Sequence, residues 1–141
     1  MGKVGKKLSE DMRRLIDAAG FAHLATLQPD GAPKVEPVWL GREGDRLLVA
    51  TDRKSLKARN IEGDPRVAIS LVALDNPYEQ LLIRGRVVET RNDDDLVGLD
   101  ALSQAYLGKP FPRRKWSSRV LYVVEPTVVR HSVSPLRDPR A

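Results

Sequence analysis

Apolar residues recur at helical spacing in two long stretches of the chain. Residues 9–20 place apolar side chains three and four positions apart, with Ser9 as a helix N-cap and acidic residues in the first turn. Residues 92–107 repeat this pattern, with Asn92 as the cap and a glycine after the last periodic residue. A third, shorter helix is predicted over residues 54–61. The first helix has one narrow apolar face, which predicts that it packs on a sheet.

Between the helices, apolar residues form short runs separated by turn signals. Pro29-Asp30-Gly31 is one such signal, because proline presets the first corner of a turn and glycine accepts a positive φ. Strands that follow one another closely pair antiparallel, and such a sheet removes its free edges by closing into a barrel. We therefore predict a mainly β protein, a small barrel of six to seven antiparallel strands with three helices outside it. The predicted strands are residues 21–28, 34–41, 46–51, 66–74, 79–90, 119–125 and 127–133, the last two being broken at Pro126.

The length of 141 residues fits one domain with its own core. We assign this domain to residues 9–133, flanked by a loose basic tail at residues 1–8 and a mobile tail at residues 134–141. No apolar run reaches the ~20 residues that span a bilayer, and no apolar stretch of a signal peptide follows the basic N-terminus. The absence of cysteine excludes disulfides and thiolate chemistry. We therefore expect a cytoplasmic protein without a membrane partner.

Charge and motif content narrow the possible functions. The net charge of +5 favours an anionic partner, but aromatic residues are sparse and no nucleic-acid-binding motif is present, so we do not expect a nucleic acid. His23 and His131 fall in separate strands without the acidic neighbours of a metal site, and no metal is expected. The run Asp93–Asp95 is interpreted as the acidic start of a helix. Metalloprotease, serine-hydrolase and phosphate-loop motifs are absent from the sequence.

The segment Leu47–Leu71 carries the strongest functional signal. An apolar run ends at Thr51-Asp52, a strongly basic stretch over residues 53–59 follows, and a second apolar run begins after Gly63-Asp64-Pro65. A strand thereby delivers hydroxyl, amide and cationic groups to one place, which suits phosphate or another anion. The alternative is a solvated basic helix that only connects two strands.

Three other features each allow two interpretations. Trp39 is either a core residue or the wall of a slot for a flat aromatic ligand. Asn76-Pro77-Tyr78 is either an ordinary turn or a loop that closes over this slot. The basic run Arg113–Lys115, followed by Trp116, is either solvated or a binding surface for an extended anion. All three would suit one ligand that is planar, apolar on its faces and phosphorylated.

Several motifs resemble those of the flavin- and deazaflavin-binding split-barrel proteins, the relatives of pyridoxamine 5′-phosphate oxidase. The resemblance covers residues 9–131, and within this group the chain is most similar to the F420-dependent oxidoreductases. The motifs that carry it are Asp30-Gly31 with Pro33 before Pro37-Val38-Trp39, Lys57-Ala58-Arg59-Asn60 with Asp64-Pro65-Arg66, Asn76-Pro77-Tyr78, and Tyr106-Leu107-Gly108-Lys109.

This resemblance implies a homodimer of split barrels with two cofactor sites at the subunit interface, in agreement with the apolar excess of the predicted strands. Residues 34–39 would line the cofactor ring, Thr51 and residues 54–57 would hold its ribityl chain and phosphate, and Asn60 would support that segment. Residues 76–78 of the second subunit would cover the ring, and the loop at residues 113–115 would meet the polyglutamate tail of F420. The implied cofactor-binding residues are Lys34, Val35, Pro37, Val38, Trp39, Thr51, Lys54, Ser55, Leu56, Lys57, Asn60, Asn76, Pro77 and Tyr78, with Lys57 as the main phosphate contact.

The same resemblance implies an oxidoreductase that transfers a hydride between F420 and an unsaturated or quinone-like organic acceptor. F420 carries a phosphodiester and several glutamates, so a basic groove is expected around it. The four cations among residues 53–59 therefore favour F420 over FMN. The protein would supply placement and electrostatics, and we expect no side chain to be an indispensable acid or base. Two alternatives stay open: an FMN-binding flavoenzyme of the same fold, and a protein that binds the deazaflavin without turnover.

Overall fold

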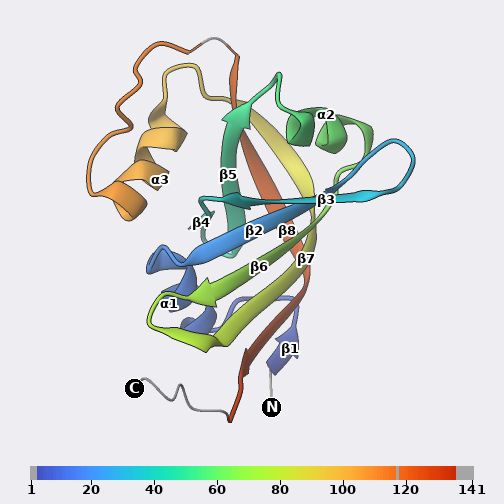
Figure 1. The fold of residues 1–141 in the computed structure, drawn as a ribbon, viewed down its shortest axis with the longest axis vertical. Helices are drawn as coiled ribbons and strands as arrows, with labels where there is room; N and C mark the ends of the chain where they lie inside the picture. Colours follow the sequence, from blue (N-terminus) through green and yellow to red (C-terminus); the bar gives the residue numbers. More distant parts are fainter. Residues whose placement is uncertain (1–2, 117, 136–141) are drawn as a thin grey trace.

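The computed structural model describes residues 3–116 and 118–135 as one curved antiparallel sheet with three helices outside it (Figure 1). Each element is short apart from two long strands. The elements are β1 (Lys3–Gly5), α1 (Glu10–Asp17), β2 (Phe21–Leu27), β3 (Pro33–Val38), β4 (Gly41–Glu43), β5 (Arg46–Asp52), α2 (Leu56–Gly63), β6 (Arg66–Ala73), β7 (Asn76–Asn92), α3 (Val97–Leu107) and β8 (Arg119–Val133). The predicted mainly β class with three helices is confirmed.

The long strands β7 and β8 pair along most of their length and connect the two halves of the sheet (Figure 1). The strand order is β3-β2-β6-β7-β8-β5-β4, with β1 paired to the second half of β8. At Gly85 the register of β7 against β8 shifts, and an added Cβ there would lie 2.5 Å from the carbonyl oxygen of Glu125. The close approach therefore requires a residue without a side chain.

The core lies on the concave side of the sheet, and α1 covers it. Alternate residues of β5 and β6 are buried, as expected for strands with one face toward a core. Met12, Leu15 and Ile16 of α1 complete this apolar cluster. None of the helices in the described part of the chain is long and apolar enough to cross a membrane.

Serine caps begin the first two helices. The Oγ of Ser9 accepts a hydrogen bond from the N–H of Met12 at 3.3 Å, so the predicted cap of α1 is confirmed. The Oγ of Ser55 accepts from the N–H of Ala58 at 3.2 Å and begins α2 in the same way. The second cap places the start of α2 directly after the turn at the end of β5.

The start of α3, which was predicted at Asn92, was wrong. Asn92 is the last residue of β7, and α3 begins at Val97. The carboxylate of Asp93 accepts from the N–H groups of Gly98 and Leu99 at 2.7 and 3.0 Å. Asp93 therefore accepts from the first turn of α3 in the way that was expected of Asn92. Pairing with β8 holds the chain extended up to Asn92, which delays the helix.

Two strand boundaries also differ from the prediction. Residues 119–133 form one strand because Pro126 pairs with Gly85 at the register shift, where the missing N–H of proline is tolerated. Residues 76–78 form the start of β7 instead of a separate turn. The short strand β4 at residues 41–43 was not predicted at all.

The expected tails are shorter in the structure. Residues 3–5 pair with β8, and Leu8 is 2% exposed, so part of the segment assigned to a loose N-terminal tail belongs to the fold. The N–H of Ser134 donates to the carbonyl of Tyr78 at 2.9 Å, which attaches the chain once more after β8. Residues 136–141 of the expected C-terminal tail lie outside the described residues.

Candidate functional site

The start of α2 gathers hydrogen-bonding groups beside the end of β5. The hydroxyls of Thr51 and Ser55 are hydrogen-bonded at 3.1 Å across the turn between these elements. Because Ser55 caps the helix, the first two N–H groups of α2, those of Leu56 and Lys57, have no hydrogen-bond acceptor among the described residues. Free N–H groups at the positive end of a helix dipole favour an anion such as phosphate.

Lys57 belongs to a three-residue charge cluster between α2 and β3. Its Nζ lies 2.5 Å from Oε1 of Glu36, and Lys34, on the same face of β3, forms an ion pair with Oε2 of the same carboxylate. Burial alone would raise the pKa of Glu36, but hydrogen bonds and charges from Lys34 and Lys57 outweigh it and lower this pKa below its ordinary value. Two ammonium groups and one carboxylate leave the cluster with a net positive charge.

A buried polar contact fixes α2 on the sheet. The side-chain amide of Asn60 donates to the hydroxyl of Thr26 on β2 at 3.0 Å, and both residues are almost fully buried. Asn60 therefore holds α2 in place and does not face solvent. Two other residues of the expected phosphate segment, Lys54 and Leu56, lie exposed on the same turn.

The side chains of β3, the strand expected to line the cofactor ring, point alternately to two faces of the sheet. Val35 and Pro37 face outward, and Val35 is 66% exposed, whereas Lys34 and Val38 are half-buried on the other side. One flat ligand cannot contact both sets through side chains. However, β3 ends the strand order, so its outer edge presents unpaired backbone groups along which a ring can lie.

Trp39 follows β3 and packs on α3. Its ring stacks on Tyr106 with centroids 5.2 Å apart, and Phe111 meets it edge-on at 5.8 Å. The hydroxyl of Tyr106 donates to the carbonyl of Gly20 at 2.9 Å and accepts from the N–H of Leu40 at 3.1 Å. These two hydrogen bonds fix the position of the Tyr106 ring against Trp39. The three rings line a hollow of about 760 Å³, so Trp39 is both packed and part of a cavity wall.

A second hollow of about 530 Å³ lies on the outward face of the sheet, over β2, β3, β6, β7 and β8. Its lining is mostly apolar and includes the exposed side chains of Val35 and Leu82, with Arg84 and Arg130 as its cations. His23 lines both hollows, which makes them neighbours. An exposed apolar face of this kind is typical of a surface covered by another chain.

Residues 76–78 are not brought to the start of α2 within one chain. They begin β7 at the end of the sheet near α1, away from α2 (Figure 1). The side-chain oxygen of Asn76 accepts from the N–H of Tyr78 at 3.0 Å, which shapes the start of β7. A role for Asn76, Pro77 and Tyr78 at the same site thus requires a second subunit.

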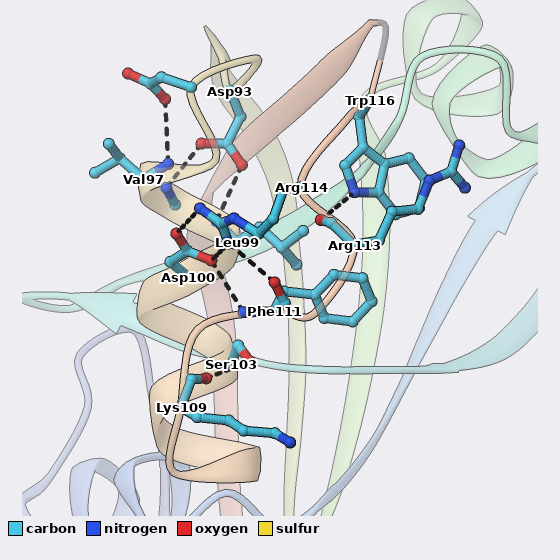
Figure 2. A network of polar contacts seen from close by, with 12 residues as sticks. Asp93, Val97, Leu99, Asp100, Ser103, Lys109, Phe111, Arg113, Arg114 and Trp116 are labelled. Atoms are coloured by element: carbon cyan, nitrogen blue, oxygen red, sulfur yellow. Dashed lines mark hydrogen bonds and ion pairs between the residues drawn. The ribbon is translucent and has the colours of Figure 1, made fainter.

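The basic loop after α3 is tied to that helix (Figure 2). Asp100 accepts two hydrogen bonds from Arg114, at 2.8 and 2.9 Å, and one from the N–H of Phe111 at 3.0 Å. The hydroxyl of Ser103 donates to the carbonyl of Lys109 at 2.6 Å. The loop at residues 109–116 is therefore held in a defined course and is not simply a solvated charge run.

Sequence reasoning did not single out Glu36 or Thr26, and it considered His23 only as a metal ligand. Glu36 follows Lys34 by two positions in a strand, and this alternation would have placed both on one face. The contact of Thr26 with Asn60 and the place of His23 between the two hollows depend on which strands and helices lie beside β2, so local sequence does not indicate them. Among the described residues, no group of three or more histidines and carboxylates could hold a metal ion.

A family model described as pyridoxamine 5′-phosphate oxidase matches residues 8–132. The structure is similar to one named F420 reductase, with 34% sequence identity and a TM-score of 0.79, over 86% of this chain and 98% of that chain. Among curated protein sequences, none matches the chain significantly.

Two more distant solved structures share the fold. A pyridoxamine 5′-phosphate oxidase-related, FMN-binding protein from Nostoc punctiforme is 20% identical, with a TM-score of 0.63 over 90% of this chain and 85% of that chain. A conserved hypothetical protein from Mycobacterium tuberculosis is 19% identical, with a TM-score of 0.72 over 97% of this chain and 98% of that chain. These likenesses confirm the predicted split-barrel fold.

Proposed function

Because the chain belongs to the pyridoxamine 5′-phosphate oxidase family, we propose that it is an oxidoreductase whose cofactor is the deazaflavin F420. The observation that carries the proposal is the start of α2. There two free N–H groups, the hydroxyls of Thr51 and Ser55, and the positive cluster around Lys57 meet. This donor set fits the phosphate of a flavin-type cofactor, because phosphate favours free N–H groups and positive charge together.

The choice of F420 over FMN rests on similarity and on charge. The solved structure named F420 reductase is 34% identical to this chain, whereas the FMN-binding protein from Nostoc punctiforme is 20% identical. Arg53, Lys54 and Arg59 lie on or beside the first turns of α2, next to Lys57. A ligand with several anionic groups gains more from these cations than a mononucleotide does.

The ring of the cofactor would lie along the free edge of β3. Backbone groups of that edge, together with the apolar side chains of Val35 and Pro37, would contact it. The ribityl chain would then run toward Thr51, and the phosphate would accept from the N–H groups of Leu56 and Lys57. Asn60 would take no direct part, since it is buried against Thr26.

A second copy of the chain would cover the outward face of the sheet and complete the site. This face is apolar and exposed, with Val35 and Leu82 at its hollow. Residues 76–78 would then reach the ring from the second copy, since they lie far from α2 in their own chain (Figure 1). The proposed assembly is a homodimer with two cofactor sites at its interface.

When bound, reduced F420 supplies the hydride. The contribution of this chain would be placement: the edge of β3 would orient the ring, and the aromatic hollow around Trp39 would give it an apolar neighbourhood. The hydroxyl of Tyr106 is engaged by Gly20 and Leu40, so it is not a free proton donor. A proton for the acceptor would come from water or from Tyr78 of the second copy.

Two other functions fit the same fold. An FMN-dependent flavoenzyme would use the same phosphate site, and a carrier would bind F420 without turnover. A turnover assay separates them: purified protein is mixed with reduced F420 and a naphthoquinone, and the return of oxidised F420 is followed by absorbance. Turnover supports the proposal, whereas F420 binding without turnover of quinone or enone acceptors identifies a carrier, and turnover only with reduced FMN identifies a flavoenzyme.

A further inference from the structure

The start of β7 has fewer backbone partners than the rest of that strand. The ladder between β6 and β7 passes from Gln80 to Asn76 with a shift of register, and the ladder between β7 and β8 begins at Glu79. Within the described part of the chain, Pro77 and Tyr78 therefore have no partner in either ladder. In the proposed function, this segment covers the ring of a cofactor bound to a second copy.

Two hydrogen bonds hold the backbone of Tyr78. Its N–H donates to the side-chain oxygen of Asn76 at 3.0 Å, and its carbonyl accepts from the N–H of Ser134 at 2.9 Å. Asn76 is the first residue of β7, and Ser134 directly follows β8, so both bonds lie at the ends of strands. Strand ends open more easily than strand centres. A side-chain contact to a better supported position would therefore help to keep Tyr78 in place.

Glu79, the residue after Tyr78, makes such a contact. Its Oε2 lies 2.8 Å from Nε2 of His131 on β8, and the two side chains are only 18% and 12% exposed. A carboxylate can only accept, so Nε2 of the imidazole is the donor. Water competes little for a contact that is shielded in this way, whereas an exposed ion pair contributes little. Buried polar pairs can select one arrangement of the chain even where they add little stability.

His131 lies at a position that is supported from both sides. Its backbone pairs with Lys3 of β1 on one side and with Leu81 of β7 on the other (Figure 1). Leu81 is fully buried in the core. The imidazole is thus carried by the middle strand of three, and Glu79 connects the start of β7 to it.

The contact between the two side chains is diagonal. Through its backbone Glu79 pairs with Val133, whereas its side chain reaches His131, which is closer to the middle of β8. Diagonal neighbours on one face of an antiparallel pair lie within reach of long side chains. Such a bond opposes both separation of the two strands and movement of one along the other.

We propose that Glu79 and His131 are positioning residues, which hold the segment Asn76–Tyr78 so that Tyr78 reaches a cofactor bound to a second copy of the chain. This inference rests on the proposed function, because that contact exists only in the proposed homodimer. Neither side chain of the pair touches the ligand. His131 acts through Glu79, and Glu79 acts through the adjacent Tyr78. A segment that is already ordered loses little conformational entropy on binding, which raises the affinity.

The test is a double-mutant cycle on F420 binding, measured by isothermal titration calorimetry. His131→Ala removes the donor, and Tyr78→Ala removes the side chain that the pair positions. His131→Gln is the conservative variant, because its amide can still donate to Glu79. Arg46→Ala is the matched control, since it breaks the ion pair between β5 and Glu125 and so removes another side-chain contact of β8.

His131→Ala should weaken F420 binding about tenfold, and His131→Gln should keep most of the affinity. In a protein that already carries Tyr78→Ala, His131→Ala should cause no further loss, which a general loss of stability would not produce. The proposal is overturned if His131→Ala binds as tightly as the unmodified protein, if the loss is the same in both backgrounds, or if Arg46→Ala causes an equal loss.

Amide hydrogen exchange without cofactor separates this proposal from the proposed function. The N–H of Tyr78 should exchange faster in His131→Ala but not in Arg46→Ala, whichever cofactor the protein binds, and an unchanged rate in His131→Ala would overturn the proposal. If the unmodified protein binds FMN and not F420, only the proposed cofactor is contradicted, and the cycle is decided with FMN. Binding of neither cofactor would contradict the proposed function and the positioning role together.

Discussion

The ammonium group of Lys57 lies 2.5 Å from a carboxylate oxygen of Glu36, so the cation expected to hold phosphate is already paired within the protein. Lys34 binds the other oxygen of the same carboxylate. Glu36 thereby positions both lysines next to the start of α2 and offsets part of their charge. A phosphate that binds there shares Lys57 with Glu36 or displaces it.

Replacing Lys57 with alanine should weaken F420 binding by about 1.5–3 kcal/mol, the scale of a charge-assisted hydrogen bond. Isothermal titration calorimetry measures this difference. Arg59→Ala is the control, because it removes an exposed cation of the same helix without touching the cluster. Equal losses in the two variants would show that only the general charge of α2 matters and would remove Lys57 from the phosphate site.

Replacing Glu36 with glutamine should tighten F420 binding severalfold, because the positive charge of Lys34 and Lys57 would no longer be offset. The effect should shrink as salt is added, since added ions screen the interaction between charges. Weaker binding in Glu36→Gln at every salt concentration would mean that the carboxylate is needed to position the lysines.

Stability should depend on pH through Glu36. Its folded-state pKa is lowered, so the charged form contributes stability that is present above its ordinary value of 4.5 and is lost as the pH falls through the folded-state pKa. Urea unfolding from pH 7 to pH 3 should therefore show a steeper loss of stability at the acidic end in the unmodified protein than in Glu36→Gln. Parallel curves would indicate that the lysines do not lower this pKa.

Asp93, which accepts two hydrogen bonds from the start of α3, should contribute to the stability of the fold. Asp93→Ala should reduce the free energy of unfolding by about 1–3 kcal/mol, because the buried N–H of Leu99 and the partly buried N–H of Gly98 lose their acceptor. Asp95→Ala is the comparison, since Asp95 accepts only the exposed N–H of Val97. Urea denaturation should show the larger loss for Asp93, and the opposite order would place the cap of α3 at Asp95.

The outward face of the sheet should mediate dimerisation. Val35→Lys places a charge in the apolar hollow and should convert a dimer into a monomer, as measured by sedimentation velocity. Val97→Lys, at a comparably exposed valine on α3, should leave the dimer intact. Dissociation by the second variant alone would move the interface to α3.

The sequence determined the fold class well because strand alternation and turn residues are local properties. Ser9 was identified as a cap since its acceptor role involves only neighbouring residues. Asn92 was mistaken for a cap because the pairing of β7 with β8, which extends the strand, is not visible in local sequence. The contact of Glu36 on β3 with Lys57 on α2 joins two separate elements, so only the packed structure reveals it.

The central claim is that the start of α2 and the edge of β3 bind F420 in preference to FMN. A side-by-side titration of the purified protein with both cofactors, followed by quenching of tryptophan fluorescence, tests it most directly, since Trp39 lies next to the proposed ring position. The account predicts tight, saturable quenching by F420 and markedly weaker quenching by FMN. Preferential binding of FMN, or binding of neither cofactor, would contradict it.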